Sequence, residues 1–168
     1  LTAESWANEM HLLPSPQNNG LNKYFYFPGF TPKTGGVILG DWDSAAHLSE
    51  TPESLRSSWA LSRPNSKKIS IFNYRHTPLE SWLESLDRIA HRQGDMIDVL
   101  ICANQNISSD FFKQSFNSLR LIQLPFVPQE DYDWLAAHCD FNLVRGEDSF
   151  VRTQWAGKPF IWDIYPQE

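Results

Sequence analysis

The segments Ile69-Ser70-Ile71-Phe72-Asn73-Tyr74 and Ile97-Asp98-Val99-Leu100-Ile101-Cys102-Ala103 decide the fold class of this chain. Both are short and mostly apolar, which is typical of strands that are buried on both faces. Between them, apolar residues recur with the spacing of one helical face; they are Leu79, Trp82, Leu83, Leu86, Ile89 and Ala90. A strand, a helix and a second buried strand predict a parallel sheet covered by helices.

The same alternation continues toward the carboxyl terminus. Further strands are predicted at residues 119–124, at 141–144 and from 160 onward, and further helices at 128–139 and 147–156. Gly157, with Pro159 just beyond it, marks the end of the last helix. We therefore predict an α/β fold, a Rossmann-like parallel sheet with flanking helices, as a single domain over residues 1–168.

Local signals are weaker elsewhere. Residues 1–20 predict a short helix followed by a loop rich in proline and asparagine. Tyr24-Phe25-Tyr26-Phe27 is aromatic and strand-like, and it stops at the turn signal Pro28-Gly29. Thr77-Pro78-Leu79-Glu80 has the pattern of a capping box with proline at the first helical position.

Composition and charge limit the classes of function. The 168 residues are 41% apolar, which is enough for one domain with a packed core. The net charge is −6 and there is no basic stripe, so we expect no binding of nucleic acid through bulk electrostatics. No apolar run approaches the ~20 residues of a membrane span, and the start of the chain lacks a signal-peptide pattern. We therefore expect no membrane association.

The two cysteines, Cys102 and Cys139, each lie in an apolar segment. Two isolated cysteines without a second pair make neither a zinc site nor a disulfide scaffold. We therefore predict that both are reduced core residues of a cytoplasmic protein.

Ligands of such sheets bind outside the carboxyl ends of the strands. The strand predicted at residues 141–144 leads directly into Arg145-Gly146-Glu147-Asp148-Ser149. The free N–H groups of a helix start suit a diphosphate. Arg145 can bind phosphate oxygens, Gly146 allows close approach, and the Ser149 hydroxyl can donate. Since a carboxylate repels phosphate, Glu147 is better suited to sugar hydroxyls. The alternative is that Glu147 and Asp148 form an acidic N-cap of an ordinary helix.

Two other strand ends carry candidates. Phe126 stands between Pro125 and the Val127-Pro128 pair, and a ring held there can stack on a base. Gln129 can bond a base edge or a phosphate; alternatively, Phe126 is a core plug and Gln129 is solvated. Tyr74 can donate to a phosphate. His76 shows no acidic or nucleophilic partner nearby in the sequence, which favours a structural role.

The glycine- and proline-rich segment Phe27–Gly36 can cradle a sugar or diphosphate, or it can be a structural turn. It matches neither a G-x-G-x-x-G fingerprint nor a Walker A loop. A Rossmann oxidoreductase and a P-loop enzyme are therefore weaker hypotheses.

Several longer motifs resemble one family, the elongation factor P arginine rhamnosyltransferases (EarP). They are Arg145-Gly146-Glu147-Asp148-Ser149-Phe150-Val151-Arg152, Gln154-Trp155-Ala156-Gly157-Lys158-Pro159-Phe160, Phe27-Pro28-Gly29-Phe30-Thr31, Thr34-Gly35-Gly36 and Ile164-Tyr165-Pro166-Gln167. The resemblance implies a GT-B architecture. It also implies inverting, metal-free transfer of L-rhamnose from dTDP-β-L-rhamnose to one arginine of elongation factor P.

The resemblance further implies roles for individual residues. Phe126 stacks on or flanks the thymine, in a pocket shaped by Phe72, Gln129 and Tyr132. The diphosphate is held by Tyr74, Arg145 and Ser149, with backbone groups of Gly146 and Asp148. Glu147 binds a donor hydroxyl or lies near the reacting centre.

Departures from the family pattern limit what this chain is expected to do. The family's amino-terminal half carries aspartates, one of them proposed as the general base for the arginine, and no segment here matches that half. Val37-Ile38-Leu39-Gly40 replaces a Leu-Leu-Arg-Glu-like run, and Asp163 replaces a histidine. The chain also begins at Leu1 rather than methionine. We therefore expect a donor-binding piece of a longer enzyme, inactive alone, with a non-catalytic protein-binding module of the same fold as the alternative.

Overall fold

The computed structural model describes residues 5–29, 31–37, 50–103 and 107–165. The chain divides into two compact units, Leu1–Gly40 and Asp41–Glu168.

The first unit is built around a small antiparallel hairpin. A 3₁₀ turn, η1 (Ser5–Asn8), precedes β1 (Leu12–Pro14), which pairs with β2 (Asn22–Tyr24) so that Leu12 lies opposite Tyr24. The predicted amino-terminal helix is thus only one turn, and β1 was not predicted. The strand-like segment 24–27 is a strand only at Tyr24. Beyond it, Phe25 N–H donates to the His11 carbonyl at 2.9 Å, and the Phe27 ring packs edge-on against Trp6 with centroids 5.6 Å apart.

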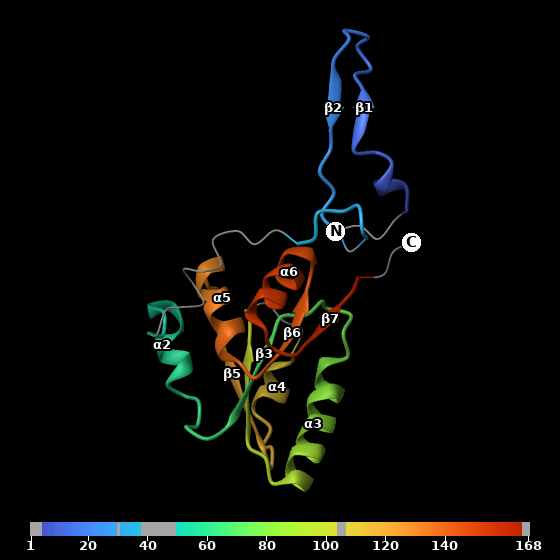
Figure 1. Cartoon of the computed structure of the whole chain (residues 1–168). Coiled ribbons are helices and arrows are strands. Elements are labelled where there is room, and N and C mark those ends of the chain that lie inside the picture. The colour runs from blue at the N-terminus through green and yellow to red at the C-terminus, as the bar shows by residue number, and fades with distance from the viewer. Residues whose placement is uncertain (1–4, 30, 38–49, 104–106, 166–168) are drawn as a thin grey trace. The chain divides into compact units, whose positions relative to one another are not determined.

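The second unit contains the predicted parallel sheet. Its strands are β3 (Lys67–Ile71), β4 (Ile97–Ile101), β5 (Leu119–Gln123), β6 (Phe141–Arg145) and β7 (Phe160–Asp163). They are all parallel and stand in the order β5-β4-β3-β6-β7 (Figure 1). The order runs outward from β3 in both directions, so the topological switch point lies between β3 and β6. In open sheets of this kind, that is where ligands bind.

Helices cover both faces of this sheet. They are α2 (Glu53–Trp59), α3 (Leu79–Gln93), α4 (Ser109–Phe112), α5 (Gln129–His138) and α6 (Glu147–Ala156). Figure 1 shows α3 on one side of the sheet and α2 and α5 on the other. The helices α3, α5 and α6 were predicted, and Gly157 ends α6 in the left-handed conformation as expected. The short helices α2 and α4 were not predicted.

The core has one apolar cluster on each face of the sheet. Leu79, Leu83 and Phe111 pack with alternate strand residues such as Ile71 and Val99 on the α3 face. The opposite cluster joins α2 and α5 to the sheet through Leu55, Leu100, Cys102, Leu124, Tyr132, Trp134, Leu135 and Cys139. Because both faces are covered, β4 is buried along its whole length, which explains why its residues other than Asp98 are apolar. Cys102 and Cys139 are buried and unpaired, as predicted.

The predicted capping box at α3 is wrong. Pro78 is the N-cap and makes no side-chain cap bond. The Thr77 hydroxyl donates to Asp163, and Glu80 Oε1 accepts from the N–H and hydroxyl of Ser108 at 2.9 and 2.8 Å. Partners that are distant in the sequence therefore replace the local ones.

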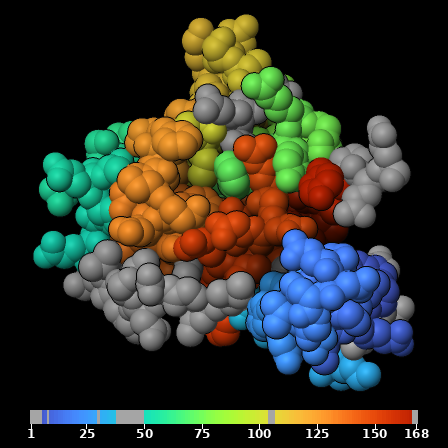
Figure 2. All heavy atoms as spheres, turned by 90° about the horizontal axis from the view of Figure 1, so that it is seen from above, coloured from blue at the N-terminus to red at the C-terminus, as the bar shows by residue number. Residues whose placement is uncertain are grey.

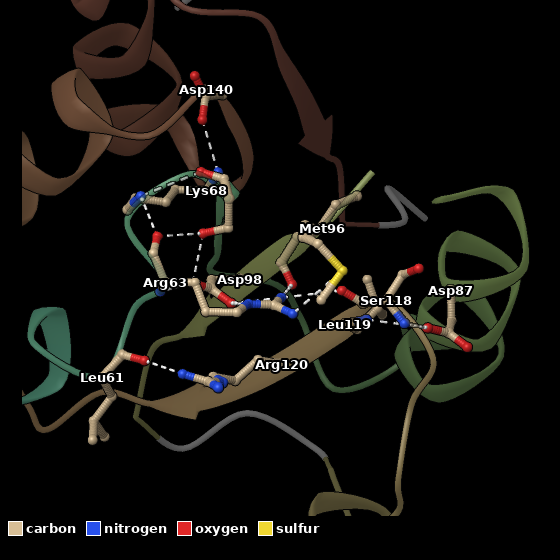
Figure 3. A network of polar contacts seen from close by, with 12 residues as sticks. Leu61, Arg63, Lys68, Asp87, Met96, Asp98, Ser118, Leu119, Arg120 and Asp140 are labelled. Atoms are coloured by element: carbon tan, nitrogen blue, oxygen red, sulfur yellow. Dashed lines mark hydrogen bonds and ion pairs between the residues drawn. The ribbon is translucent and has the colours of Figure 1, made fainter. Parts of the chain in front are cut away.

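A polar network closes the amino ends of the strands (Figure 3). Asp98 is fully buried and accepts from Arg63 Nε at 2.7 Å, while Arg63 Nη2 donates to the Ile97 carbonyl at 2.7 Å. Beside it, burial acts to raise the pKa of Asp87, but N–H groups of Ser118 and its neighbours outweigh burial and hold that pKa below its usual value. Structural contacts thus occupy the amino ends of the strands, so a binding site is expected at the carboxyl ends.

No helix among the described residues combines the length and apolarity needed to cross a bilayer. Over the same ranges, no three histidine, cysteine or acidic side chains come together as a metal site.

Candidate functional site

A pocket of about 150 Å³ opens at the carboxyl ends of β3, β4 and β5, where α5 and α6 begin. The residues that line it are Phe72, Cys102, Ala103, Pro125, Phe126, Val127, Gln129, Tyr132 and Ser149. Figure 2 shows α5 and α6, in orange and red-orange, side by side. The pocket therefore draws on three strand ends and two helix starts.

Phe126 is the exposed edge of this pocket. Its side chain is 85% exposed, so the alternative that it is a core plug is wrong. An exposed large aromatic ring beside a cavity is suited to stacking on a flat ligand. Gln129 is also exposed, and its amide nitrogen lies 3.4 Å from Asp133 Oδ1.

Tyr132 and Phe72 form the inner wall. Their rings meet edge-on with centroids 5.7 Å apart. The Tyr132 hydroxyl is buried and makes no hydrogen bond to the described residues. Burial raises its pKa well above the usual value, while the Ser149 hydroxyl acts to lower it. A neutral donor is thus held ready beside the pocket.

Arg145, the last residue of β6, brings a positive charge to the same edge. Its guanidinium lies 4.4 Å from the centre of the Phe72 ring and 5.0 Å from that of Tyr74. Its charge also reaches Cys102, since burial raises the pKa of that thiol to about 12 while Arg145 acts to lower it. Arg145 therefore adds a positive charge beside Phe72 and Tyr74 at this edge of the sheet.

The turn from β6 into α6 depends on Gly146, which has φ 72° and is the N-cap of the helix. The N-cap is thus Gly146 and not an acid, and Glu147 and Asp148 stand in the exposed first turn, where acids suit an ordinary helix start as well. Phe150 N–H makes the first helical bond, to the Gly146 carbonyl. Earlier amides of a helix point outward from its start, so donors here face the carboxyl edge of the sheet.

An ion-pair network holds the first turn of α6 against α5. Arg152 Nε donates to Asp148 at 2.9 Å, and Arg152 Nη1 donates to the buried Asp133 at 2.6 Å. Asp148 is thereby turned toward a cation of its own helix. This pairing reduces the repulsion that Asp148 would exert on an anion at the helix start.

The comparisons with known proteins agree with this architecture. The family model described as "Elongation-Factor P (EF-P) rhamnosyltransferase EarP" matches residues 1–168, the whole chain. The chain belongs to the EarP family. The resemblance inferred from the motifs is thus confirmed.

Relatives called "Protein-arginine rhamnosyltransferase" match the whole chain. The one from Pseudomonas putida is 39% identical over 181 residues, with 48% of its own length covered. The one from Pseudomonas aeruginosa is 40% identical over 185 residues, also with 48% covered. The chain therefore spans about half the length of these curated EarP relatives.

A solved EarP structure, described as "Structural basis for EarP-mediated arginine glycosylation of translation elongation factor EF-P", has a similar fold. It superposes with a TM-score of 0.66 at 34% identity, covering 84% of this chain and 50% of that one. The predicted α/β fold class is therefore confirmed.

The structure places all of the predicted site residues at one edge of the EarP domain. Phe72, Phe126, Gln129, Tyr132 and Ser149 line the pocket. Tyr74 follows the end of β3, Arg145 ends β6, and Gly146, Glu147 and Asp148 come directly after it at the switch point.

Four lining residues were missed: Cys102, Ala103, Pro125 and Val127. Cys102 and Ala103 end the predicted strand 97–103. The rule that ligands bind at the carboxyl ends of parallel strands would therefore have identified them.

His76 has an acidic neighbour that the sequence did not reveal. Its Nε2 lies 3.8 Å from Asp163 Oδ1. Asp163 stands where the EarP pattern has histidine, and only the sheet brings it to His76. The Phe27–Gly36 segment belongs to the first unit, where Gly29 N–H donates to the Gly36 carbonyl at 3.0 Å, as in a structural turn. Phe30, residues 38–40, Pro166 and Gln167 lie outside the described residues.

Proposed function

We propose that this chain is the dTDP-β-L-rhamnose-binding part of an EarP enzyme that transfers rhamnose, with inversion, to an arginine of elongation factor P. One observation carries the proposal. A small aromatic pocket, a guanidinium and a glycine-led helix start lie together at the switch point of a parallel sheet. Family membership selects the nucleotide sugar from the ligands that such a site accepts.

Each part of the donor has a matching chemical environment. Phe126 offers an exposed ring for the thymine, next to the pocket wall of Phe72 and Tyr132. Arg145, Ser149, the Tyr74 hydroxyl and the amides of Gly146 and Asp148 supply donors for the diphosphate. Glu147 is left for a hydroxyl of the sugar, since a carboxylate accepts hydrogen bonds from hydroxyls but repels phosphate.

The same groups explain how the leaving group departs without a metal ion. Negative charge develops on dTDP as the bond to the sugar breaks. A fixed guanidinium and helix amides stabilise that charge more strongly in the transition state than in the ground state. The aspartate expected to deprotonate the acceptor arginine belongs to a part of the enzyme that this chain does not match. We therefore expect the chain alone to bind donor without turnover.

Calorimetric titration with dTDP tests the proposal. Saturable binding by the folded chain supports it. Absence of binding at millimolar dTDP would count against donor binding. In that case, retention of the chain on immobilised elongation factor P, unaffected by dTDP, would favour a non-catalytic interaction module.

A further inference from the structure

Asp163, the last residue of β7, links three elements at the site edge. It stands opposite Arg145 in the register of β6 and β7. Its Oδ2 accepts the Tyr74 N–H at 2.7 Å and the Thr77 hydroxyl at 2.5 Å. Because β6 lies between β3 and β7, the carboxylate reaches across the end of β6 to the loop that follows β3. Its side chain is only 13% exposed.

The two hydrogen bonds that Asp163 accepts form an anchor that determines where Tyr74 lies. The Tyr74 ring stacks on His76 with centroids 5.6 Å apart and faces the Arg145 guanidinium at 5.0 Å. Its hydroxyl is beside Gly146, 3.8 Å from the position that a Cβ would occupy there. The tyrosine is thus fixed through its backbone by Asp163, and it carries its hydroxyl to the start of α6.

The charge of Asp163 has the wrong sign for an anion site. Coulomb repulsion by a carboxylate beside Arg145 would weaken the binding of a diphosphate. Positioning and charge therefore predict opposite effects when Asp163 is removed, which makes its role measurable.

We propose that Asp163 is a positioning residue for the diphosphate subsite, holding the 74–77 loop across the end of β6 so that the Tyr74 hydroxyl and Arg145 face one anion. This inference rests on the proposed function. It concerns a residue at which this chain departs from the family pattern.

The experiment compares Asp163→Ala with Asp163→Asn by NMR titration of dTDP and of thymidine, which lacks the diphosphate. The Ala variant loses the acceptor, and we expect its dTDP affinity to fall about tenfold while its thymidine affinity is unchanged. The Asn variant keeps one oxygen that can accept both hydrogen bonds and loses the charge, so it should bind dTDP at least as tightly as wild type.

A matched control is Asp95→Ala. Asp95 pairs with Lys67 at 2.7 Å at the amino end of the sheet, so this variant also removes one paired carboxylate. We expect it to change neither affinity. If Asp163→Ala does not fold, Thr77→Val removes one of the two anchoring bonds and should give a smaller loss of dTDP affinity in the same direction.

Three outcomes would overturn the inference. They are an Ala variant that binds dTDP as tightly as wild type or tighter, an equal loss for dTDP and thymidine, and an Asn variant as weak as the Ala variant. Failure of wild type to bind dTDP would instead defeat the proposed function and, with it, the diphosphate role. The anchor itself is then judged by amide exchange at Tyr74, which should be faster in the Ala variant than in the Asn variant; equal rates would refute it.

Discussion

The Arg145 guanidinium lies over the Phe72 ring, 4.4 Å from its centre. A cation held on an aromatic face has already lost much of its rotational freedom. The cost of orienting Arg145 is therefore met during folding rather than during binding. Such preorganisation is what stabilisation of a departing diphosphate requires.

Replacing Arg145 with alanine should weaken dTDP binding by about 1.5–3 kcal/mol, the range for a hydrogen bond to a charged group. Lysine should restore only part of the loss, because it lacks the planar fork that stacks on Phe72 and binds two oxygens. Calorimetry measures both variants. Arg88→Ala is the control, since Arg88 is exposed on α3 and its guanidinium donates to Ser85 on the same helix. An unchanged affinity in Arg145→Ala would refute the role assigned to Arg145.

Phe126→Ala should separate binding from stability. Because the ring is 85% exposed, its removal should change the free energy of unfolding by less than about 0.5 kcal/mol. Loss of base stacking should weaken dTDP binding by about 1–3 kcal/mol, and tryptophan should restore it. Urea denaturation and calorimetry give the two numbers. Equal dTDP affinity for wild type and Phe126→Ala would remove Phe126 from the base site.

Glu147→Gln should distinguish the sugar from the nucleotide. The amide keeps the shape of the side chain but weakens acceptance from a sugar hydroxyl, so affinity for dTDP-rhamnose should fall by about 1 kcal/mol. Affinity for dTDP should not fall, because removal of a carboxylate cannot weaken the attraction of an anion. Parallel titrations with both ligands provide the test, and a matching drop for dTDP would place Glu147 elsewhere.

Arg152→Ala should destabilise the chain in a pH-dependent way. Asp133 is 3% exposed, and burial raises its pKa while Arg152 acts to lower it. Without Arg152 the pKa of Asp133 rises further, so the folded state holds its proton more tightly than the unfolded state does. Stability of the variant then falls as pH rises through that raised pKa, and it recovers on acidification.

At neutral pH the loss should be about 1–2 kcal/mol, below the usual cost of breaking a buried pair because Arg152 is 35% exposed. Urea denaturation at several pH values measures it. Adding Asp133→Asn should remove the pH dependence; a double variant that retains the dependence would assign it to another group.

The sequence predicted the sheet because four of the five residues of β4 are apolar, which is typical of a strand covered on both faces. It failed where distant partners overrule local patterns. Thr77 and Glu80 match a capping box, yet they bond Asp163 and Ser108 instead. The hairpin strand β1 is only three residues long, Leu12–Pro14, too short to leave a periodic pattern.

The candidate site also has residues that the sequence predicted and residues whose contacts only the fold reveals. Strand ends pointed to Arg145, Phe126 and Tyr74, because any parallel sheet brings its carboxyl ends to one edge. Asp163 was seen only as a departure from a family pattern. Its contact with Tyr74 joins residues 89 positions apart, a relation that depends on strand order and that no local spacing encodes.

The thiol in the pocket wall has a practical consequence. Cys102 is 7% exposed, and with a pKa of about 12 it carries almost no thiolate at neutral pH. An electrophilic nucleotide analogue seated in the pocket would therefore find an inert sulfur beside it. We therefore expect alkylation of Cys102 to be slow in the folded chain.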